Sequence, residues 1–303
     1  MQLPSRVWAD LTSRHFFQLA ASDRINQAVA VLPVAATEQH GPHLPVSVDT
    51  TLVDGVIQAA LPHLHADLPA LFMPTQQVGK SNEHIRFPGT LTLSAQTLMA
   101  VWMELGACVA RAGIKKLVLL NSHGGQVSVM DIVARDLRTA HDLIVYSTNW
   151  YTLPLGDEVL GLFPPAEHRF GIHAGDMETS MMLALREKYV DMAQAKDFRS
   201  TAEERATQYP ILGNGSSAKL GWQVQDYNPQ GAAGNAAIAT AAKGQALLDA
   251  AGLQLARLLQ EVSDLSLTTL NPHARPDLQA EFNTEPFSAD EFAAGAAGGK
   301  QAP

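Results

Sequence analysis

The sequence contains a single cysteine, Cys108, among its 303 residues. One thiol excludes a disulfide framework or a cysteine-based zinc site within one chain. The sequence also lacks a surplus of positive charge, because 21 Lys and Arg residues face 30 Asp and Glu residues and the net charge is −9 with neutral histidines. This balance argues against a nucleic acid or an anionic membrane as the main partner and favours a small-molecule substrate.

Signals for export, membrane insertion and nucleotide binding are lacking as well. No stretch approaches the ~18 consecutive apolar residues of a membrane span. Residues 1–10 have no basic start followed by an apolar run, so we expect a cytoplasmic protein. The glycine pair Gly124-Gly125 does not have the spacing of a phosphate-binding loop, and nucleotide binding is therefore not supported.

Apolar runs of strand length alternate with segments of helical periodicity. Residues 28–36, 116–121 and 143–146 are rich in Val and Leu, whereas residues 98–109 and 127–137 repeat apolar side chains every three or four positions. This alternation predicts an α/β fold with a mostly parallel sheet covered by helices on both faces. Ligands of such folds bind beyond the carboxyl ends of the strands.

The remaining segments predict two long loops and one more helix. Residues 153–170 and 207–234 are rich in Gly, Pro and Asn without sustained periodicity, which is typical of loops. Residues 236–262 carry an apolar stripe at helical spacing. We expect one domain over residues 1–270 and a partly disordered tail, rich in Pro, Ala and Gly, over residues 271–303.

Three clusters of metal-ligand residue types lie where the predicted sheet presents its ligands. Glu38 and His40 follow the first strand and project to one side, because alternate residues of an extended chain share a face; Asp49 comes nine residues after His40. His123 follows the second strand, and Glu178 lies at the start of a predicted helix. A helix-capping acid at Asp49 and a helix-dipole role for Glu178 are the alternatives. Three clusters in one chain favour a metal site.

Charge arithmetic indicates how many metal ions these residues suit. Three carboxylates and two imidazoles exceed what one tetrahedral catalytic metal with an open position uses. Two divalent ions bring four positive charges, the carboxylates remove three, and a bridging hydroxide would neutralise the last and act as nucleophile. Histidine and carboxylate ligands without thiolate suit Zn, Mn or Fe. The sequence therefore predicts a hydrolase with two divalent metal ions per chain.

Six of the eleven histidines have no acidic residue at ligand spacing. For these we expect surface or packing roles, and we assign them no function. They are His15, His63, His65, His141, His168 and His273.

The sequence resembles the creatininase family of metal-dependent amidohydrolases in four motifs within roughly residues 30–185. These are Leu32-Pro33-Val34 with Glu38-Gln39-His40-Gly41-Pro42-His43-Leu44-Pro45 and Asp49, then Glu83-His84 with Phe87-Pro88-Gly89-Thr90-Leu91, then Asn121-Ser122-His123-Gly124-Gly125, and finally His173-Ala174-Gly175 with Glu178-Thr179-Ser180. The resemblance implies a three-layer α/β/α domain with a binuclear metal centre. It also implies a homohexamer.

The resemblance further implies a set of metal ligands, with Asp49 shared by both ions. These ligands are Glu38, His40, Asp49 and His123. In creatininase itself the metal-binding histidine is followed by Tyr and Glu, and that Glu is a ligand, whereas this chain has Gly124 and Gly125. We predict that Glu178 takes over as the fifth ligand and so acts in catalysis. Because of this departure, the resemblance does not imply creatinine as the substrate.

Further residues acquire roles through the same resemblance. His173 resembles the family histidine beside the substrate that passes a proton to the leaving nitrogen, a role that a pKa near neutrality permits; helix-entry packing is the alternative. Ser81 and His84 precede the second motif, and we predict that they contact substrate. Trp150 and Tyr151 follow the third predicted strand, where either an aromatic lid or core packing would account for them.

These observations predict a hydrolase that opens a C–N bond of a small, cyclic amide. One alternative is hydrolysis of a carbocyclic or sugar-like ring ketone by the same metal centre. A second alternative is a non-catalytic binding protein that uses metal only to fix its loops. The second would have a saturated metal site, whereas catalysis requires an open coordination position.

Overall fold

The main sheet consists of four parallel strands. The computed structural model describes residues 3–270 and gives the strand order β2-β1-β3-β4. Val29 pairs with Lys116 and Val34 with Asn121, so β1 and β3 end together at one edge. The strands are β1 (Val29–Val34), β2 (Ala70–Phe72), β3 (Lys116–Asn121) and β4 (Ile144–Asn149).

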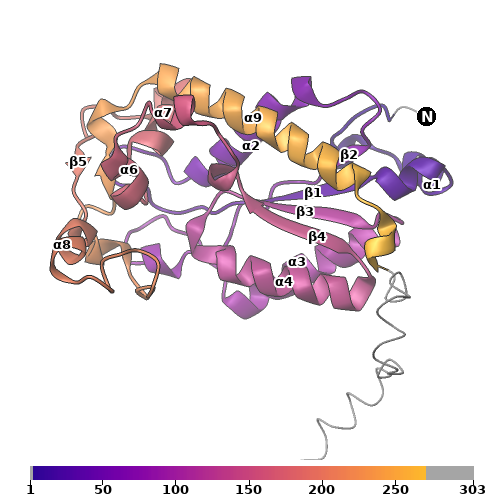
Figure 1. Ribbon diagram of the computed structural model, residues 1–303, viewed down its shortest axis with the longest axis horizontal. Helices are drawn as coiled ribbons and strands as arrows, with labels where there is room; N and C mark the ends of the chain where they lie inside the picture. Colours follow the sequence, from indigo (N-terminus) through magenta and orange to yellow (C-terminus); the bar gives the residue numbers. More distant parts are fainter. Residues whose placement is uncertain (1–2, 271–303) are drawn as a thin grey trace, which may run out of the picture. The chain divides into compact units, whose positions relative to one another are not determined.

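Helices cover both faces of this sheet, which confirms the predicted α/β fold (Figure 1). Val29 and Val31 on β1 belong to a core with α2 and α9, whereas Ala30 and Leu32 belong to a core with α3 and α4. Because both faces are buried, the strands read as continuous apolar runs. The covering helices are α2 (Val48–Ala60) and α9 (Ala241–Asp264) on one face, and α3 (Ala95–Arg111) and α4 (Val127–His141) on the other.

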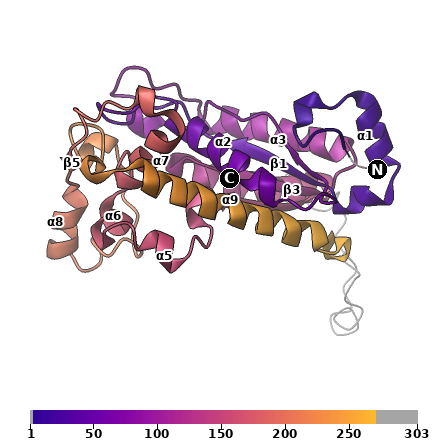
Figure 2. The same ribbon diagram turned by 90° about the horizontal axis from the view of Figure 1, so that it is seen from above.

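Shorter elements gather at the end of the molecule opposite α1, as Figure 2 shows. There β5 and β6 form a small antiparallel sheet, in which Phe198 pairs with Gly234. These shorter elements are α5 (Asp157–Leu160), α6 (Pro165–Phe170), α7 (Asp176–Arg186), α8 (Thr201–Gln208), β5 (Asp197–Phe198) and β6 (Gly234–Asn235), and α1 (Ser13–Ala20) lies at the other end.

Some element boundaries differ from the prediction. The helix expected from residue 236 begins at Ala241, because Ala236–Ile238 form a 3-10 turn and the Thr240 side chain caps the helix by accepting from the Lys243 amide. Residues 153–170, predicted as a loop, contain α5 and α6, which are too short to show periodicity.

Residues up to Leu265 form one compact unit, and a second unit begins at Ser266. The described part of the second unit contains a 3-10 turn, Leu267–Leu270. The predicted tail, residues 271–303, lies outside the described residues. Within residues 3–270, none of the helices combines the length and the apolar character that crossing a membrane requires.

Candidate metal centre

All five predicted metal ligands converge at the carboxyl edge of the sheet. Glu38 and His40 follow β1, His123 follows β3, and Asp49 and Glu178 lie in the first turns of α2 and α7. His123 Nδ1 is 3.2 Å from Glu38 Oε1 and 3.4 Å from Asp49 Oδ2. His40 Nε2 is 3.5 Å from Asp49 Oδ1 and 3.8 Å from Glu178 Oε2. Parallel strands that end at one edge bring these distant segments together.

Buried ligand atoms without partners show that this cluster fits a cation. Glu38 Oε2, His40 Nε2 and Asp49 Oδ2 are buried and have no hydrogen-bond partner. A buried polar atom left unpaired costs about 1–3 kcal/mol, and one bound cation would remove this cost for several atoms of the cluster at once. Imidazole and carboxylate donors without thiolate suit a divalent ion such as Zn or Mn. The alternative of a capping role for Asp49 does not hold, because the N-cap of α2 is Ser47.

His173 faces the same cluster through one ring nitrogen. Its Nε2 lies 2.8 Å from the Gln39 carbonyl oxygen, and its Nδ1 lies 3.7 Å from Glu38 Oε1. Because a carbonyl only accepts hydrogen bonds, Nε2 carries the proton and Nδ1 presents a lone pair to the cluster. Burial, followed by the charge of His40, lowers the pKa of His173 to about 4. The imidazole is therefore neutral at neutral pH.

A strained residue connects His173 to Glu178. Ala174 has a φ of 54°, in the left-handed region that non-glycine residues rarely adopt. Its backbone N–H donates to Glu178 Oε2 over 2.5 Å. The same carboxylate oxygen faces His40, so one side chain contributes to the cluster and holds the turn that presents His173.

Ser81 and His84 lie behind the ligands. Gln39 donates its side-chain amide to His84 Nδ1 over 2.8 Å, so the protonated His84 Nε2 points at Glu38 Oε1, 3.4 Å away. Ser81 Oγ lies 3.4 Å from His123 Nε2. Both residues are buried and neither lines the cavity beside the cluster. His84 contacts Glu38 and Ser81 contacts His123, both predicted ligands, and the contacts of Ser81 and His84 with substrate stay a prediction.

The cluster opens into a cavity of about 380 Å³. Trp150 is buried in its wall, where the indole N–H donates to Ser122 Oγ over 3.1 Å, and Tyr151 packs edge-on against it at 5.5 Å. Among the described residues, none of those lining the cavity is Lys or Arg. They are Glu38, Asp49, Ser122, His123, Gly124, Trp150, Tyr151, Leu160, Glu167, His168, Gly171, Ile172, His173, Gly175, Met177 and Glu178.

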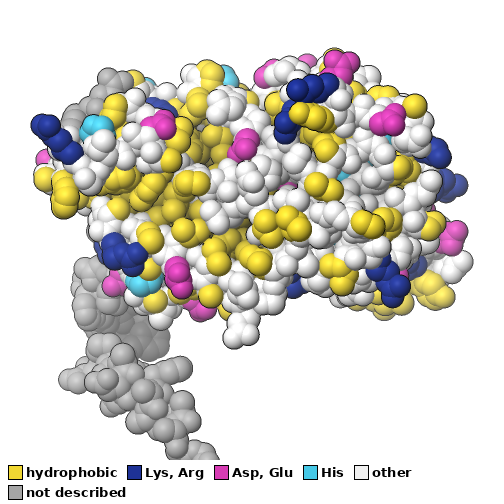
Figure 3. Space-filling view, turned by 180° about the vertical axis from the view of Figure 1, so that it is seen from behind, with side chains coloured by type: hydrophobic (Ala, Val, Ile, Leu, Met, Phe, Trp, Pro, Cys, Tyr) yellow, Lys and Arg dark blue, Asp and Glu magenta, His cyan; other side chains and the backbone are white. Residues whose placement is uncertain are grey.

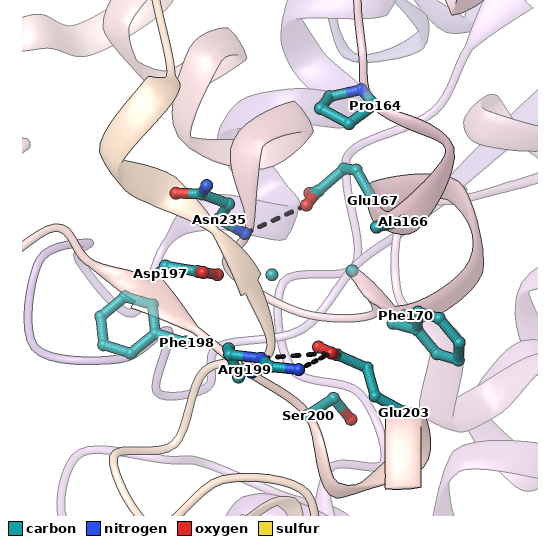
Figure 4. Close-up of a pocket in the computed structure, with 12 residues that line it drawn as sticks. Pro164, Ala166, Glu167, Phe170, Asp197, Phe198, Arg199, Ser200, Glu203 and Asn235 are labelled. Atoms are coloured by element: carbon teal, nitrogen blue, oxygen red, sulfur yellow. Dashed lines mark hydrogen bonds and ion pairs between the residues drawn. The ribbon is translucent and has the colours of Figure 1, made fainter. Parts of the chain in front are cut away.

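Two cavity residues were given no role by the sequence analysis. His168 is exposed and lines the cavity, and its Nε2 lies 2.9 Å from the Leu160 carbonyl oxygen. Glu167 is buried and accepts from the Asp176 amide over 2.7 Å and from the Asn235 amide over 3.1 Å, the latter drawn in Figure 4. It thereby ties the start of α7 to β6.

Glycines around Glu167 are the signal that could have identified it. A Cβ at Gly171 or at Gly175 would overlap the Glu167 carboxyl group. Glu167 also lines a second cavity of about 170 Å³, in whose wall Arg199 pairs with Glu203 (Figure 4). Glu167 therefore forms part of the wall of both cavities.

The charges of the cluster shift the pKa values of its members. Burial by itself lowers the pKa of His40, but Asp49 overcomes this and raises it to about 9. Likewise, burial lowers and Glu38 raises the pKa of His123, which lies well above its usual value. Burial and the charge of Glu38 raise the pKa of Asp49 to about 6. In the metal-free protein the imidazoles of His40 and His123 are therefore positively charged at neutral pH, with a proton on each ring nitrogen. A metal ion must displace the proton from the nitrogen to which it binds.

We expect the metal-free protein to lose stability as the pH rises from 6.5 to 9. A histidine whose folded pKa exceeds its unfolded value of about 6.5 stabilises the fold fully below pH 6.5, and this contribution disappears as the pH passes the folded pKa. For His40, whose pKa rises from 6.5 to about 9, the loss in the free energy of unfolding is on the order of 3 kcal/mol. Urea unfolding at pH 6.5, 7.5 and 9, with chelator and with saturating metal, measures it. A metal-free protein with equal stability at all three values would contradict the expected charge states.

The family profile described as "Creatininase: Creatinine amidohydrolase" matches residues 10–259. A mycofactocin precursor peptide peptidase from Mycobacterium tuberculosis is 32% identical over 231 residues, which are 73% of this chain and 80% of that protein. A creatinine amidohydrolase from Pseudomonas putida is 32% identical over 204 residues, which are 63% of this chain and 74% of that protein.

Solved structures show the same relationship. A crystal structure of creatinine amidohydrolase has a TM-score of 0.70 at 26% identity and covers 87% of this chain and 100% of its own. Another structure, described as "Creatininase Mn", has a TM-score of 0.67 at 25% identity, with 86% and 100% covered. Fold and site thus define an α/β hydrolase whose clustered donors suit divalent metal ions. The chain belongs to the creatininase family, which confirms the resemblance seen in its motifs.

Proposed function

We propose that this chain is an amidohydrolase that uses two divalent metal ions to cleave a C–N bond of a small, cyclic amide. The position of Asp49 is the observation that carries the proposal. Its Oδ1 faces His40, which has Glu178 beside it, and its Oδ2 faces His123, which has Glu38 beside it. Two donor groups that share one carboxylate support a pair of ions.

In this proposal His40 and Glu178 would hold one ion, and His123 and Glu38 would hold the other. Asp49 would contribute to both sites. Zn, Mn and Fe all suit these donors. Bound divalent ions would supply Lewis acidity and would bring the pKa of water to about 7.

Proton transfer falls to His173. Its neutral imidazole has the Nε2 proton fixed on the Gln39 carbonyl oxygen, so Nδ1 is the atom that can accept a proton from an attacking water. Nδ1 then gives this proton to the nitrogen that leaves when the C–N bond breaks. A positioned acid–base group of this kind contributes typically about 10²–10⁴-fold to a rate.

The cavity supports a neutral small molecule as substrate. Its volume of about 380 Å³ lies in the range of small-molecule sites, about 300–1,000 Å³. Trp150 and Tyr151 in its wall supply aromatic surface, which suits a flat ring. Its described lining includes no Lys or Arg, so neither of these side chains is present there to bind a carboxylate or phosphate group. An amide of a short peptide is the second candidate, favoured by the 32% identity to the mycofactocin precursor peptide peptidase.

Metal analysis combined with an activity panel tests the proposal. Protein purified without added metal or chelator is expected to contain close to two metal ions per chain. Dialysis against chelator should abolish hydrolysis, and Zn, Mn or Fe should restore it. The panel contains cyclic amides, formamides, short peptides and a ring ketone. Failure to bind metal on readdition would refute the metal centre, and metal binding without hydrolysis of any compound would favour a binding protein.

We also propose that the chain assembles as a homohexamer in the cytoplasm, as the family resemblance implies. Hydrophobic side chains gather across the middle of the face drawn in Figure 3. Exposed apolar patches are typical of surfaces that associate with other chains. Light scattering of the purified protein measures the number of subunits.

A further inference from the structure

Glu83 is a buried carboxylate of the site to which the mechanism above gives no role. It lies in the 3-10 turn Asn82–His84, and its Oε1 is 3.3 Å from His123 Nε2. We infer that Glu83 is a positioning residue, whose charge and bulk hold His123 in the orientation that presents Nδ1 to a metal ion. The inference rests on the proposed function, because it assigns His123 as a metal ligand.

Two neighbours decide which nitrogen of His123 is free. Nε2 lies 2.9 Å from the Lys80 carbonyl oxygen and beside the Glu83 carboxylate, and both groups only accept hydrogen bonds. Nε2 therefore carries the proton. Nδ1, on the other side of the ring, faces Glu38 and Asp49, and it is the nitrogen that a metal ion would deprotonate. The ring is thus bound at one nitrogen by acceptors and available for metal at the other.

Glu83 acts through its charge as well as its position. Its Oε1 is buried and has no hydrogen-bond partner, because the Lys80 carbonyl oxygen takes the Nε2 proton. A carboxylate this close to the N–H side of an imidazole makes the opposite nitrogen a stronger ligand. Glu83 lies on the Nε2 side of the ring, and one of its carboxylate oxygens also lies within 4.8 Å of a Glu38 oxygen, so the metal stoichiometry measured below distinguishes a positioning residue from a ligand.

Gly125 provides the space that this arrangement needs. A Cβ at position 125 would overlap Glu83 Oε1 and would lie 2.6 Å from His123 Nε2. Its neighbour Gly124 differs, because a Cβ there would meet no atom within 4 Å. The two glycines of the third motif therefore differ in the space around them. Only the second makes room for the Glu83 carboxylate.

The experiment compares metal affinity in matched variants of the full chain. Glu83→Gln keeps the shape and removes the charge; Glu104→Gln, on an exposed part of α3, is its control. Gly125→Ala displaces the carboxylate, and Gly124→Ala is its control. Chelator competition gives the affinity for Zn²⁺ and Mn²⁺, elemental analysis at saturating metal gives the stoichiometry, and the visible spectrum of the Co²⁺-loaded protein reports on the ligand field.

We expect Glu83→Gln and Gly125→Ala to bind the wild-type number of ions, with at least one affinity lowered about 10–100-fold. The Co²⁺ spectrum should shift in both, while both controls keep wild-type values. Unchanged affinity and spectrum in Glu83→Gln would overturn the inference, as would the loss of one ion at saturation, which would make Glu83 a ligand. A wild-type protein that binds no metal would overturn the proposed function and this inference together.

Discussion

Asp49→Ala is expected to release both metal ions and to reduce amide hydrolysis by about 10³-fold or more. The two oxygens of Asp49 face two different predicted histidine ligands, so this substitution removes a donor from both groups. Metal ions contribute several kcal/mol to stabilising the charge of the transition state, and each 1.36 kcal/mol is about tenfold in rate. Elemental analysis and the initial rate of hydrolysis measure the two effects on the same sample.

The stability of Asp49→Ala should depend on metal in a way that separates the ligand role from a packing role. Metal at 100 times its Kd stabilises a protein by about 2.7 kcal/mol per site, and we expect the variant to gain none of this. Without metal its stability should lose the fall between pH 6.5 and 9 that His40 gives the wild type, because Asp49 is the group that raises the pKa of His40 to about 9. Asp54→Ala, on the same helix, is the control that should retain metal-dependent stability. Two ions bound to Asp49→Ala would rule out the shared ligand.

His173→Ala is expected to slow turnover by about 10²–10⁴-fold while the protein keeps its metal. The imidazole Nδ1 faces the cluster but carries no bond to it, so its loss should remove proton transfer without opening the donor groups. Because the reaction then depends on solvent for its proton, the limb of the kcat–pH profile that reports the histidine should disappear. His65→Ala, at an exposed position, controls for the general effect of losing an imidazole.

The opposite result for His173 has a clear structural meaning. Its unprotonated nitrogen is 3.7 Å from Glu38 Oε1, close enough to join a metal shell after a small movement. If His173→Ala were to lose one metal ion, His173 would be a ligand. Glu178 would then be left with its hydrogen bond to the Ala174 amide as its main role.

The sequence predicted that Glu38, His40 and His123 would lie close together because all three follow strands. Glu38, His40 and His123 come directly after apolar runs that end at one edge of a parallel sheet, so the alternation of strands and helices was enough to bring them together. The β3 strand has the predicted bounds, residues 116–121, because its burial on both faces makes it a continuous apolar run.

Contacts between side chains on irregular segments could not be predicted in this way. Glu83 and Glu167 meet their partners through tertiary packing, and Glu167 reaches Asn235 across 68 positions of sequence. No periodicity marks such contacts. The three-residue strand β2 was missed for a related reason, since it is too short to alternate or to form a recognisable run.

The left-handed backbone of Ala174 limits the orientations that are open to the neighbouring His173 imidazole. Glycine would adopt this conformation without the cost of about 1–2 kcal/mol that alanine bears, yet glycine would also leave the unfolded chain more conformational entropy and the folded loop more ways to bend. With alanine, the segment has few conformations, and the Glu178 carboxylate selects one of them through the Ala174 amide. Alanine at position 174 thus lowers the stability of the fold, and it restricts the position of the His173 imidazole more than glycine would.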